Sequence, residues 1–310
     1  MKRLNVAYFG SPDFSACLLE KLITASSMNR YIKIKLVVTQ PDRPIGRKQV
    51  LTSTPVKIIA KKYNIKLLEI GNFLGQLDQL EIRSLDLVLV YAFSAIVPKD
   101  LLDLPKYGYW CIHPSLLPKY RGTSPMATAL ISGDKITGVT IIKMDEKIDH
   151  GPIITQKKYQ ILLTDKRSDL EIKLTDLAFE MVKKLVKTGI EEKGKIFLNP
   201  RQDPFLTKEQ DHTKASYTKK LTKQAGFIEF KKLIPTKSGE NSPEKLFNLF
   251  RGLYPWPGIW TILPNGKRLK ITDMKLVRNG RDRSLQIKCV QLEGKKEVDF
   301  KTFKKAYKIF

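Results

Sequence analysis

The feature that most constrains the fold is an alternation of short apolar runs and longer amphipathic stretches over the first two hundred residues. The runs that predict strands are Leu4–Phe9, Lys35–Thr39, Leu85–Tyr91, Tyr109–His113, Val139–Met144 and Ile153–Tyr159. Helices are predicted at Asp13–Ala25, Pro55–Tyr63 and Ser168–Thr188. This alternation is typical of βαβ units. We therefore expect an α/β domain with a Rossmann-like, mostly parallel sheet over residues 1–198.

The remainder of the chain has a different pattern. Residues 199–213 contain two prolines and show no periodicity, which predicts a linker. Beyond it, short apolar runs bounded by turn residues predict strands at Gly226–Phe230, Gly258–Leu263, Arg268–Leu276 and Leu285–Gln291, and helices at Pro243–Leu253 and Asp299–Tyr307. Short strands at this spacing indicate a small β-barrel over residues 214–310.

The charge balance is strongly basic. The chain of 310 residues has 56 Lys and Arg against 31 Asp and Glu, a net charge of +25, and its 42% of hydrophobic residues excludes a mostly disordered protein. Residues 208–310 alone carry +14, against +11 for the first 207. Such a surface suits a polyanionic partner, although charge by itself does not distinguish RNA, DNA, an anionic membrane or simple solvation.

Several classes of protein are disfavoured. No run of about 18 apolar residues occurs, so we expect no membrane-spanning helix. The N-terminus, MKRLNVAYFG, lacks the features of a secretory signal. The cysteines are few and far apart: Cys17, Cys111 and Cys289. This predicts a reducing compartment, the cytoplasm, and no disulfide framework. The three histidines form no zinc-ligand spacing, so we expect no metal.

The first predicted strand ends in Gly10-Ser11-Pro12-Asp13. This sequence is neither a G-x-G-x-x-G fingerprint nor a P-loop. It therefore argues against an NAD enzyme or an NTPase, despite the Rossmann-like pattern.

The stretch YWCIHPSLLPKYRG, residues 109–122, carries the first candidate site. His113 ends a predicted strand, and α/β proteins bind ligands at the carboxyl edge of the sheet. Pro114 and Pro118 predict an extended loop after it. We expect that loop to expose backbone N–H and C=O groups able to hold a flat heterocycle.

The stretch MDEKIDHGP, residues 144–152, places three carboxylates in a predicted turn between two strands. If the sheet is parallel and open, this turn lies at the same edge as His113. A carboxylate there can hydrogen-bond the imidazole and favour its charged form, which makes an acid–base pair. The alternative is an ordinary solvated turn.

These two stretches resemble the signatures of the 10-formyltetrahydrofolate-dependent formyltransferases. Further segments resemble the methionyl-tRNA formyltransferases within that family: FGSPDFS at 9–15, TQPDRPIGRK at 39–48, QDHTKASYTKKLTK at 210–223, YPWPG at 254–258 and VQLEGKKEVDFKTFKKAY at 290–307. The segments occur in the family's order over nearly the whole chain.

The resemblance implies roles for individual residues. The catalytic histidine and aspartate of that family correspond to His113 and Asp149 in this sequence. The implied folate contacts are Ser115, Leu116, Leu117 and Pro118, with Tyr91 and Asp145. The loop Asp42–Thr54 would reach toward the tRNA acceptor end. The implied tRNA contacts are Arg43, Arg47 and Lys48 on this loop, and Lys219, Lys220, Lys267, Arg268 and Lys270 on a C-terminal domain similar to an OB-fold.

The implied reaction moves a formyl group from 10-formyltetrahydrofolate, a co-substrate, to the α-amine of methionyl-initiator-tRNA for translation initiation. His113 would stabilise the developing oxyanion or transfer the proton, and Asp149 would support its charge. The resemblance calls for no metal and no membrane, and we expect a monomer.

One position departs from the family pattern. Cys111 occupies the place of a catalytic asparagine two residues before His113, and strand periodicity directs both side chains to the same side. Because a thiol is a weaker hydrogen-bond donor than an amide, we expect an enzyme that binds folate and turns over slowly. The alternatives are that Cys111 merely packs, or that a charged His113 lowers the pKa of the thiol and makes it a nucleophile. Two other functions stay open: a related formyltransferase or formyltetrahydrofolate hydrolase acting on another acceptor, and a tRNA-binding protein whose catalytic centre has decayed.

Overall fold

The computed structural model describes residues 3–46, 48–71, 79–191, 207–233, 242–279 and 282–307. The chain forms two compact units, both discontinuous in sequence. The first comprises residues 1–123, 138–159 and 171–217, and the second comprises 124–137, 160–170 and 218–310. Most of the predicted linker, 199–206, lies outside the described residues, and its remainder packs within the first unit.

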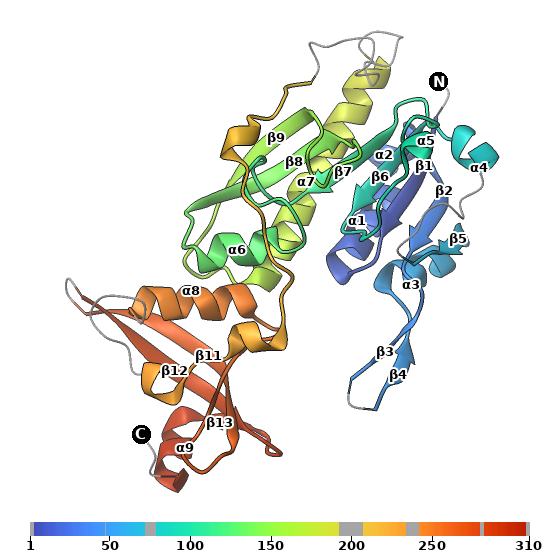
Figure 1. Ribbon diagram of the computed structural model, residues 1–310. Coiled ribbons are helices and arrows are strands. Elements are labelled where there is room, and N and C mark those ends of the chain that lie inside the picture. Colours follow the sequence, from blue (N-terminus) through green and yellow to red (C-terminus); the bar gives the residue numbers. More distant parts are fainter. Residues whose placement is uncertain are drawn as a thin grey trace. The chain divides into compact units, whose positions relative to one another are not determined.

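The first unit contains a seven-stranded sheet (Figure 1). Its strands, in spatial order, are β5 (Lys66–Glu69), β2 (Ile32–Thr39), β1 (Leu4–Gly10), β6 (Leu87–Tyr91), β7 (Tyr109–His113), β8 (Ile136–Lys143) and β9 (Ile153–Gln160). Neighbours from β5 to β7 are parallel, whereas β8 is antiparallel to β7. The predicted mostly parallel α/β domain is confirmed.

Helices cover both faces of this sheet, as burial of a parallel sheet requires. On one face, the Tyr8 hydroxyl donates to the carbonyl oxygen of Ser15 in α1 (Asp13–Thr24) over 2.7 Å. On the other, Phe9 packs in a cluster with Ile82 of α4 (Gln79–Arg83) and Leu101 of α5 (Lys99–Leu102). The remaining helices with residues in this unit are α2 (Ser26–Asn29), α3 (Pro55–Lys62) and α7 (Arg167–Glu191).

The loop that follows β2 contains a hairpin. β3 (Arg43–Ile45) pairs antiparallel with β4 (Val50–Thr52). The aliphatic side chains of both strands, Ile45, Val50 and Leu51, are largely exposed. At the base of the hairpin, Lys57 Nζ lies 2.8 Å from both Asp42 Oδ1 and Glu69 Oε1. These contacts raise the pKa of Lys57, and the Lys57 ammonium lowers the pKa of Asp42.

The second unit is built on an antiparallel sheet of β10 (Ile259–Ile262), β11 (Arg268–Asn279), β12 (Asp282–Leu292) and β13 (Glu297–Asp299), in that order. The helices α8 (Pro243–Leu253) and α9 (Phe300–Tyr307) pack on it through Phe250 and Phe303. The prediction of a small β domain after the α/β domain is confirmed, and the described strands form a four-stranded antiparallel sheet.

The predicted strand at Gly226–Phe230 is wrong. Two short 3₁₀ helices, Lys223–Gly226 and Phe230–Leu233, occupy this region, and one isolated bridge joins Phe227 to Trp260. The backbone passes so close to Gly258 that a Cβ on Gly226 would lie 1.9 Å from the Gly258 carbonyl oxygen. The glycine thus marks a close backbone approach rather than a strand.

Two segments that precede residue 171, 124–137 and 160–170, belong to the second unit. Helix α6 (Pro125–Ile131), which the sequence analysis missed, packs on α8 where Gly252 leaves no room for a side chain. The Arg251 side chain is 3% exposed, and its Nη1 donates to the carbonyls of Leu162, Leu163 and Asp165. This buried guanidinium holds the loop 160–166 against α8.

Gly10, the last residue of β1, lies where the structure leaves no room for a side chain, which a substitution can test. A Cβ at this position would lie 2.0 Å from Ser15 Oγ and 2.9 Å from the Tyr91 carbonyl oxygen. Gly10→Ala would displace the Ser15 hydroxyl from its hydrogen bond with Tyr91 O. We expect a loss of about 1–3 kcal/mol in the free energy of unfolding, measured by chemical denaturation. Gly71→Ala, with no atom within 4 Å, is the control. Equal denaturation midpoints for both variants would refute this prediction.

Candidate active site

His113 ends β7 at the carboxyl edge of the sheet and is 4% exposed. Its Nε2 lies 2.8 Å from the carbonyl oxygen of Tyr120, and its Nδ1 lies 3.4 Å from Asp149 Oδ1. Each ring nitrogen therefore faces an oxygen acceptor. An imidazolium can donate to both oxygens, whereas either neutral tautomer can donate to only one.

The Asp149 carboxylate connects three parts of the site. Besides His113, its Oδ1 lies 3.9 Å from Cys111 Sγ, and its Oδ2 accepts a hydrogen bond of 2.7 Å from the Gly122 backbone N–H. Its side chain is 11% exposed. The predicted contact between the histidine and a carboxylate of the 144–152 turn is therefore present.

The contact arises for a different reason than the sequence suggested. Because β8 runs antiparallel to β7, Lys143 pairs with Trp110 near the opposite end of that strand from His113. The chain then doubles back, and Gly151 packs so tightly that a Cβ would lie 1.8 Å from the Lys143 carbonyl oxygen. This reversal returns Asp149 to the level of Cys111 and His113.

Three residues that follow β6, β7 and β8 along the chain have a positive φ. Ala92, which follows β6, has φ of 55°, Tyr120 has φ of 66° and Asp149 has φ of 50°. Non-glycine residues rarely adopt this left-handed conformation, and they do so most often where a site requires it. Both Tyr120 and Asp149 face the His113 ring.

The Cys111 thiol is held in its neutral form. Burial and, to a smaller extent, the neighbouring Asp149 carboxylate raise the pKa of Cys111 well above its ordinary value. The alternative of a lowered pKa and a nucleophilic thiol is therefore wrong, because burial dominates and the neighbouring Asp149 carboxylate acts in the same direction. The thiol is therefore a weak hydrogen-bond donor rather than a nucleophile.

The loop after His113 is integrated into the protein rather than open. Ser115 is fully buried, and its Oγ donates to the Lys119 carbonyl over 2.6 Å. Thr140 Oγ1 donates to the Ser115 carbonyl and accepts from Leu117 N–H, and Gln156 Nε2 donates to the Leu117 carbonyl over 3.0 Å. The expectation that this loop exposes its backbone groups is therefore wrong for Ser115 and Leu117.

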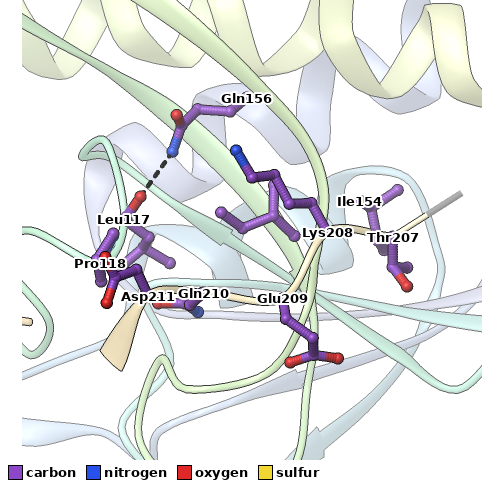
Figure 2. A pocket seen from close by; sticks show the side chains of 10 residues that line it. Leu117, Pro118, Ile154, Gln156, Thr207, Lys208, Glu209, Gln210 and Asp211 are labelled. Carbon is purple, nitrogen blue, oxygen red and sulfur yellow. Dashed lines mark hydrogen bonds between the residues drawn. The ribbon is translucent and has the colours of Figure 1, made fainter. Parts of the chain in front are cut away.

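A cavity of about 410 Å³ lies beside this loop (Figure 2). Leu117, Pro118, Ile153 and Ile154 give it apolar walls, and Gln156 and residues 207–211 supply most of its polar groups. Its volume is in the range of small-molecule sites. Two of the predicted folate contacts, Leu117 and Pro118, line it.

The remaining predicted ligand contacts have different surroundings. Tyr91 is fully buried, and its hydroxyl lies 3.1 Å from Thr175 Oγ1 in α7, so its side chain is not available to a ligand. Leu116 is half-buried. Asp145 is partly exposed, and its Oδ2 lies 2.6 Å from His150 Nδ1.

The predicted tRNA contacts are mostly at the surface. Arg43 and Lys48 are exposed in the hairpin region, and Arg47 lies outside the described residues. In the second unit, Lys219, Lys220 and Lys267 are exposed, whereas Arg268 and Lys270 are half-buried.

Residue-type reasoning missed three neighbours of the site. Arg121 and Gln210 are 1% and 4% exposed and hydrogen-bonded to each other, and His212 Nδ1 also lies 2.8 Å from Arg121 Nη2. The ring of His212 stacks on that of His150 at 3.9 Å. The only available signal was the position of Gln210 and His212 within the segment QDHTKASYTKKLTK.

Two negative findings hold within the described ranges. No helix there is both long and apolar enough to cross a membrane. Nor do those residues bring three His, Cys, Asp or Glu side chains together as ligands for a metal ion.

Comparison with known proteins is decisive about the family. Residues 2–186 match the formyl transferase family, and residues 220–282 match the formyl transferase C-terminal domain. A methionyl-tRNA formyltransferase of Caldicellulosiruptor saccharolyticus is 34% identical over 331 aligned positions, which cover 99% of this chain and 98% of that protein. The chain belongs to the formyltransferase family.

Other members support the same assignment. The methionyl-tRNA formyltransferase of Halothermothrix orenii is 40% identical over 86% of this chain and 78% of its own. Among solved structures, a sugar N-formyltransferase from a Shewanella species has a TM-score of 0.60 at 17% identity, covering 87% of this chain and 97% of that one. The N-formyltransferase of Helicobacter canadensis also has a TM-score of 0.60 at 17% identity, covering 90% of each chain. At such low identity the structures establish the shared fold.

The state of the Cys111 thiol gives a direct chemical prediction for this formyltransferase. Only the thiolate reacts rapidly with iodoacetamide. The pKa of Cys111 is raised more strongly than that of Cys17, and its side chain is less exposed, so Cys111 should react more slowly than Cys17. Peptide mass spectrometry after timed labelling at pH 7.5 measures both rates. Labelling of Cys111 as fast as Cys17 would show that the thiol is activated.

Proposed function

We propose that this protein transfers the formyl group of 10-formyltetrahydrofolate to the α-amine of methionyl-initiator-tRNA. The observation that carries the proposal is the contact between His113 and Asp149, at the carboxyl edge of the sheet, in a chain whose full-length relatives are methionyl-tRNA formyltransferases. 10-Formyltetrahydrofolate supplies the formyl group as a co-substrate.

The protein's own residues account for the proton and the charge. When the amine attacks the formyl carbon, the formyl oxygen gains negative charge and the amine loses a proton. The bond between the carbon and N10 of the folate then breaks, and N10 leaves with a proton. Once a substrate displaces its bond to the Tyr120 carbonyl, His113 can stabilise that oxygen as an imidazolium or, as a neutral ring, accept the proton of the amine and pass it on. Asp149 stabilises the positive charge on the ring and fixes its orientation.

The proposed folate contacts are Leu116, Leu117, Pro118 and Asp145. The apolar walls and polar rim of the cavity at Leu117 and Pro118 suit a ring system with polar edges. Ser115 and Tyr91 are buried and act by holding the loop and the sheet. Solved formyltransferases of the same fold were crystallised with folates, including 5-N-formyltetrahydrofolate. We propose no metal.

The proposed tRNA contacts are in two regions. Arg43, Arg47 and Lys48 belong to the hairpin region, and Lys219, Lys220, Lys267, Arg268 and Lys270 belong to the basic C-terminal region. Contacts of this kind neutralise phosphates and release counterions. We further propose that the protein acts as a cytoplasmic monomer, with a catalytic region at 1–198, a linker at 199–213 and a tRNA-binding region at 214–310.

A formylation assay tests this proposal. We expect label from 10-formyltetrahydrofolate to appear on charged initiator tRNA, and His113→Gln, which approximates the ring's volume, to lower kcat by about 10²–10⁴-fold. Assays with an amino-sugar nucleotide, and for release of free formate, run in parallel. Transfer only to the sugar, or release of formate alone, would overturn the proposal.

Cys111 gives a second test. An asparagine amide at this position can donate a stronger hydrogen bond to the developing oxyanion than a neutral thiol, and one such donor is worth roughly 10²–10³ in kcat. We expect Cys111→Asn to raise kcat, by up to about 10²-fold, more than it changes either KM. Cys289→Ser, in the second unit, is the control. An unchanged or lower kcat would contradict this prediction, and tight tRNA binding without any turnover by the wild type would instead support a decayed enzyme.

A further inference from the structure

The segment 207–217, which we call the strap, runs across the candidate active site within the first unit. Backbone hydrogen bonds of 2.8 Å in both directions join Lys208 to Ile153. Farther along, Ser216 accepts from the backbone N–H of Arg121 and, through its Oγ, from that of Tyr120. The strap therefore contacts the loop that follows His113 and the start of β9, next to the 144–152 turn.

We propose that Gln210 of the strap is a positioning residue that holds Asp149 in its catalytic conformation. This inference rests on the proposed formyl transfer, because it concerns the efficiency of that reaction. The proposal assigns a positioning role to the strap, none of whose residues takes part chemically in the proposed transfer.

The Gln210 side chain is 4% exposed, and its amide makes three hydrogen bonds. Its Nε2 donates to the carbonyl oxygens of Asp149, over 3.0 Å, and Gly151, over 2.7 Å, and its Oε1 accepts from Arg121 Nη2 over 2.7 Å. Reversing the amide would place two carbonyl oxygens against its oxygen and a guanidinium against its NH₂. The surroundings therefore permit one orientation only.

The two carbonyls that Gln210 binds belong to the 144–152 turn. Asp149 has a φ of 50°, a left-handed conformation that is uncommon outside glycine, although aspartate adopts it more readily than most residues. By fixing the carbonyls of Asp149 and Gly151, Gln210 stabilises this conformation. The conformation in turn directs the Asp149 carboxylate to His113 and to the Gly122 N–H.

Arg121 completes the arrangement. Its side chain is 1% exposed, and since a guanidinium only donates, Gln210 Oε1 and His212 Nδ1 must both accept from it. Arg121 precedes Gly122, whose N–H binds Asp149 Oδ2. A closed ring of contacts thus connects Arg121, Gln210, Asp149 and Gly122.

The test replaces the amide without changing its size. Gln210→Glu can still accept from Arg121 but places a carboxylate oxygen against two carbonyls, and Gln210→Met fills similar space without hydrogen bonds. We expect both variants to lower kcat for tRNA formylation by about 10–100-fold, as small misplacements of catalytic groups do, with both KM values within about threefold of wild type. Thr213→Ala changes an exposed strap residue that contacts Asp211, and it is the control.

A second measurement does not depend on turnover. Hydrogen exchange at the Gly122 amide reports directly on its bond to Asp149. We expect exchange there to accelerate at least tenfold in both Gln210 variants and to stay unchanged in Thr213→Ala, with melting temperatures recorded for all. Wild-type kcat and wild-type exchange in a folded Gln210→Met protein would overturn the inference. A wild-type protein that formylates no tRNA would refute the proposed function, whereas accelerated exchange in the variants would still support the positioning of Asp149 by Gln210.

Discussion

Burial of the Asp149 carboxylate is the constraint around which this part of the molecule is organised. A nearly buried charge is costly unless hydrogen bonds or an opposite charge compensate it. Asp149 finds its partners in the His113 ring, the Gly122 N–H and, more weakly, the Cys111 thiol. These groups come from β7 and from the loop that follows it. The strand, the loop and the 144–152 turn must therefore fold into one arrangement for the charge to be accommodated.

Two buried arginines extend this principle to the rest of the chain. Arg121 donates to Gln210 and His212 and thereby joins the strap to the catalytic loop. Arg251 donates to three carbonyls of the loop 160–166 and joins that loop to α8. A guanidinium that is withdrawn from water needs acceptors for its N–H groups within the protein, and here carbonyls and an amide from distant segments accept from the Nη atoms. This explains how each compact unit recruits segments that are far apart in sequence.

Residues 115–118, Ser-Leu-Leu-Pro, also have a structural role besides the proposed contact with folate. Thr140 and Gln156, from β8 and β9, satisfy the backbone of Ser115 and Leu117. The loop is consequently a fixed wall of the neighbouring cavity, and a rigid wall needs no ordering when a ligand binds. Cys111 likewise has a packing role, because a neutral thiol beside Asp149 fills its place in the site while it offers only a weak hydrogen-bond donor.

The sequence by itself determined the features that depend on local preference. Apolar runs and amphipathic periodicity predicted every strand from β6 to β9 and the helices α1, α3, α7 and α8, and strand periodicity placed Cys111 and His113 on one side. Motif order indicated the family. The tertiary structure alone decided how Asp149 reaches His113, because the direction of β8 reverses the expected geometry, and it alone showed that Gln210 and Arg121 belong to the site. Those contacts join residues 27 to 89 positions apart, and they depend on strand direction and on the satisfaction of buried polar groups, neither of which a local pattern encodes.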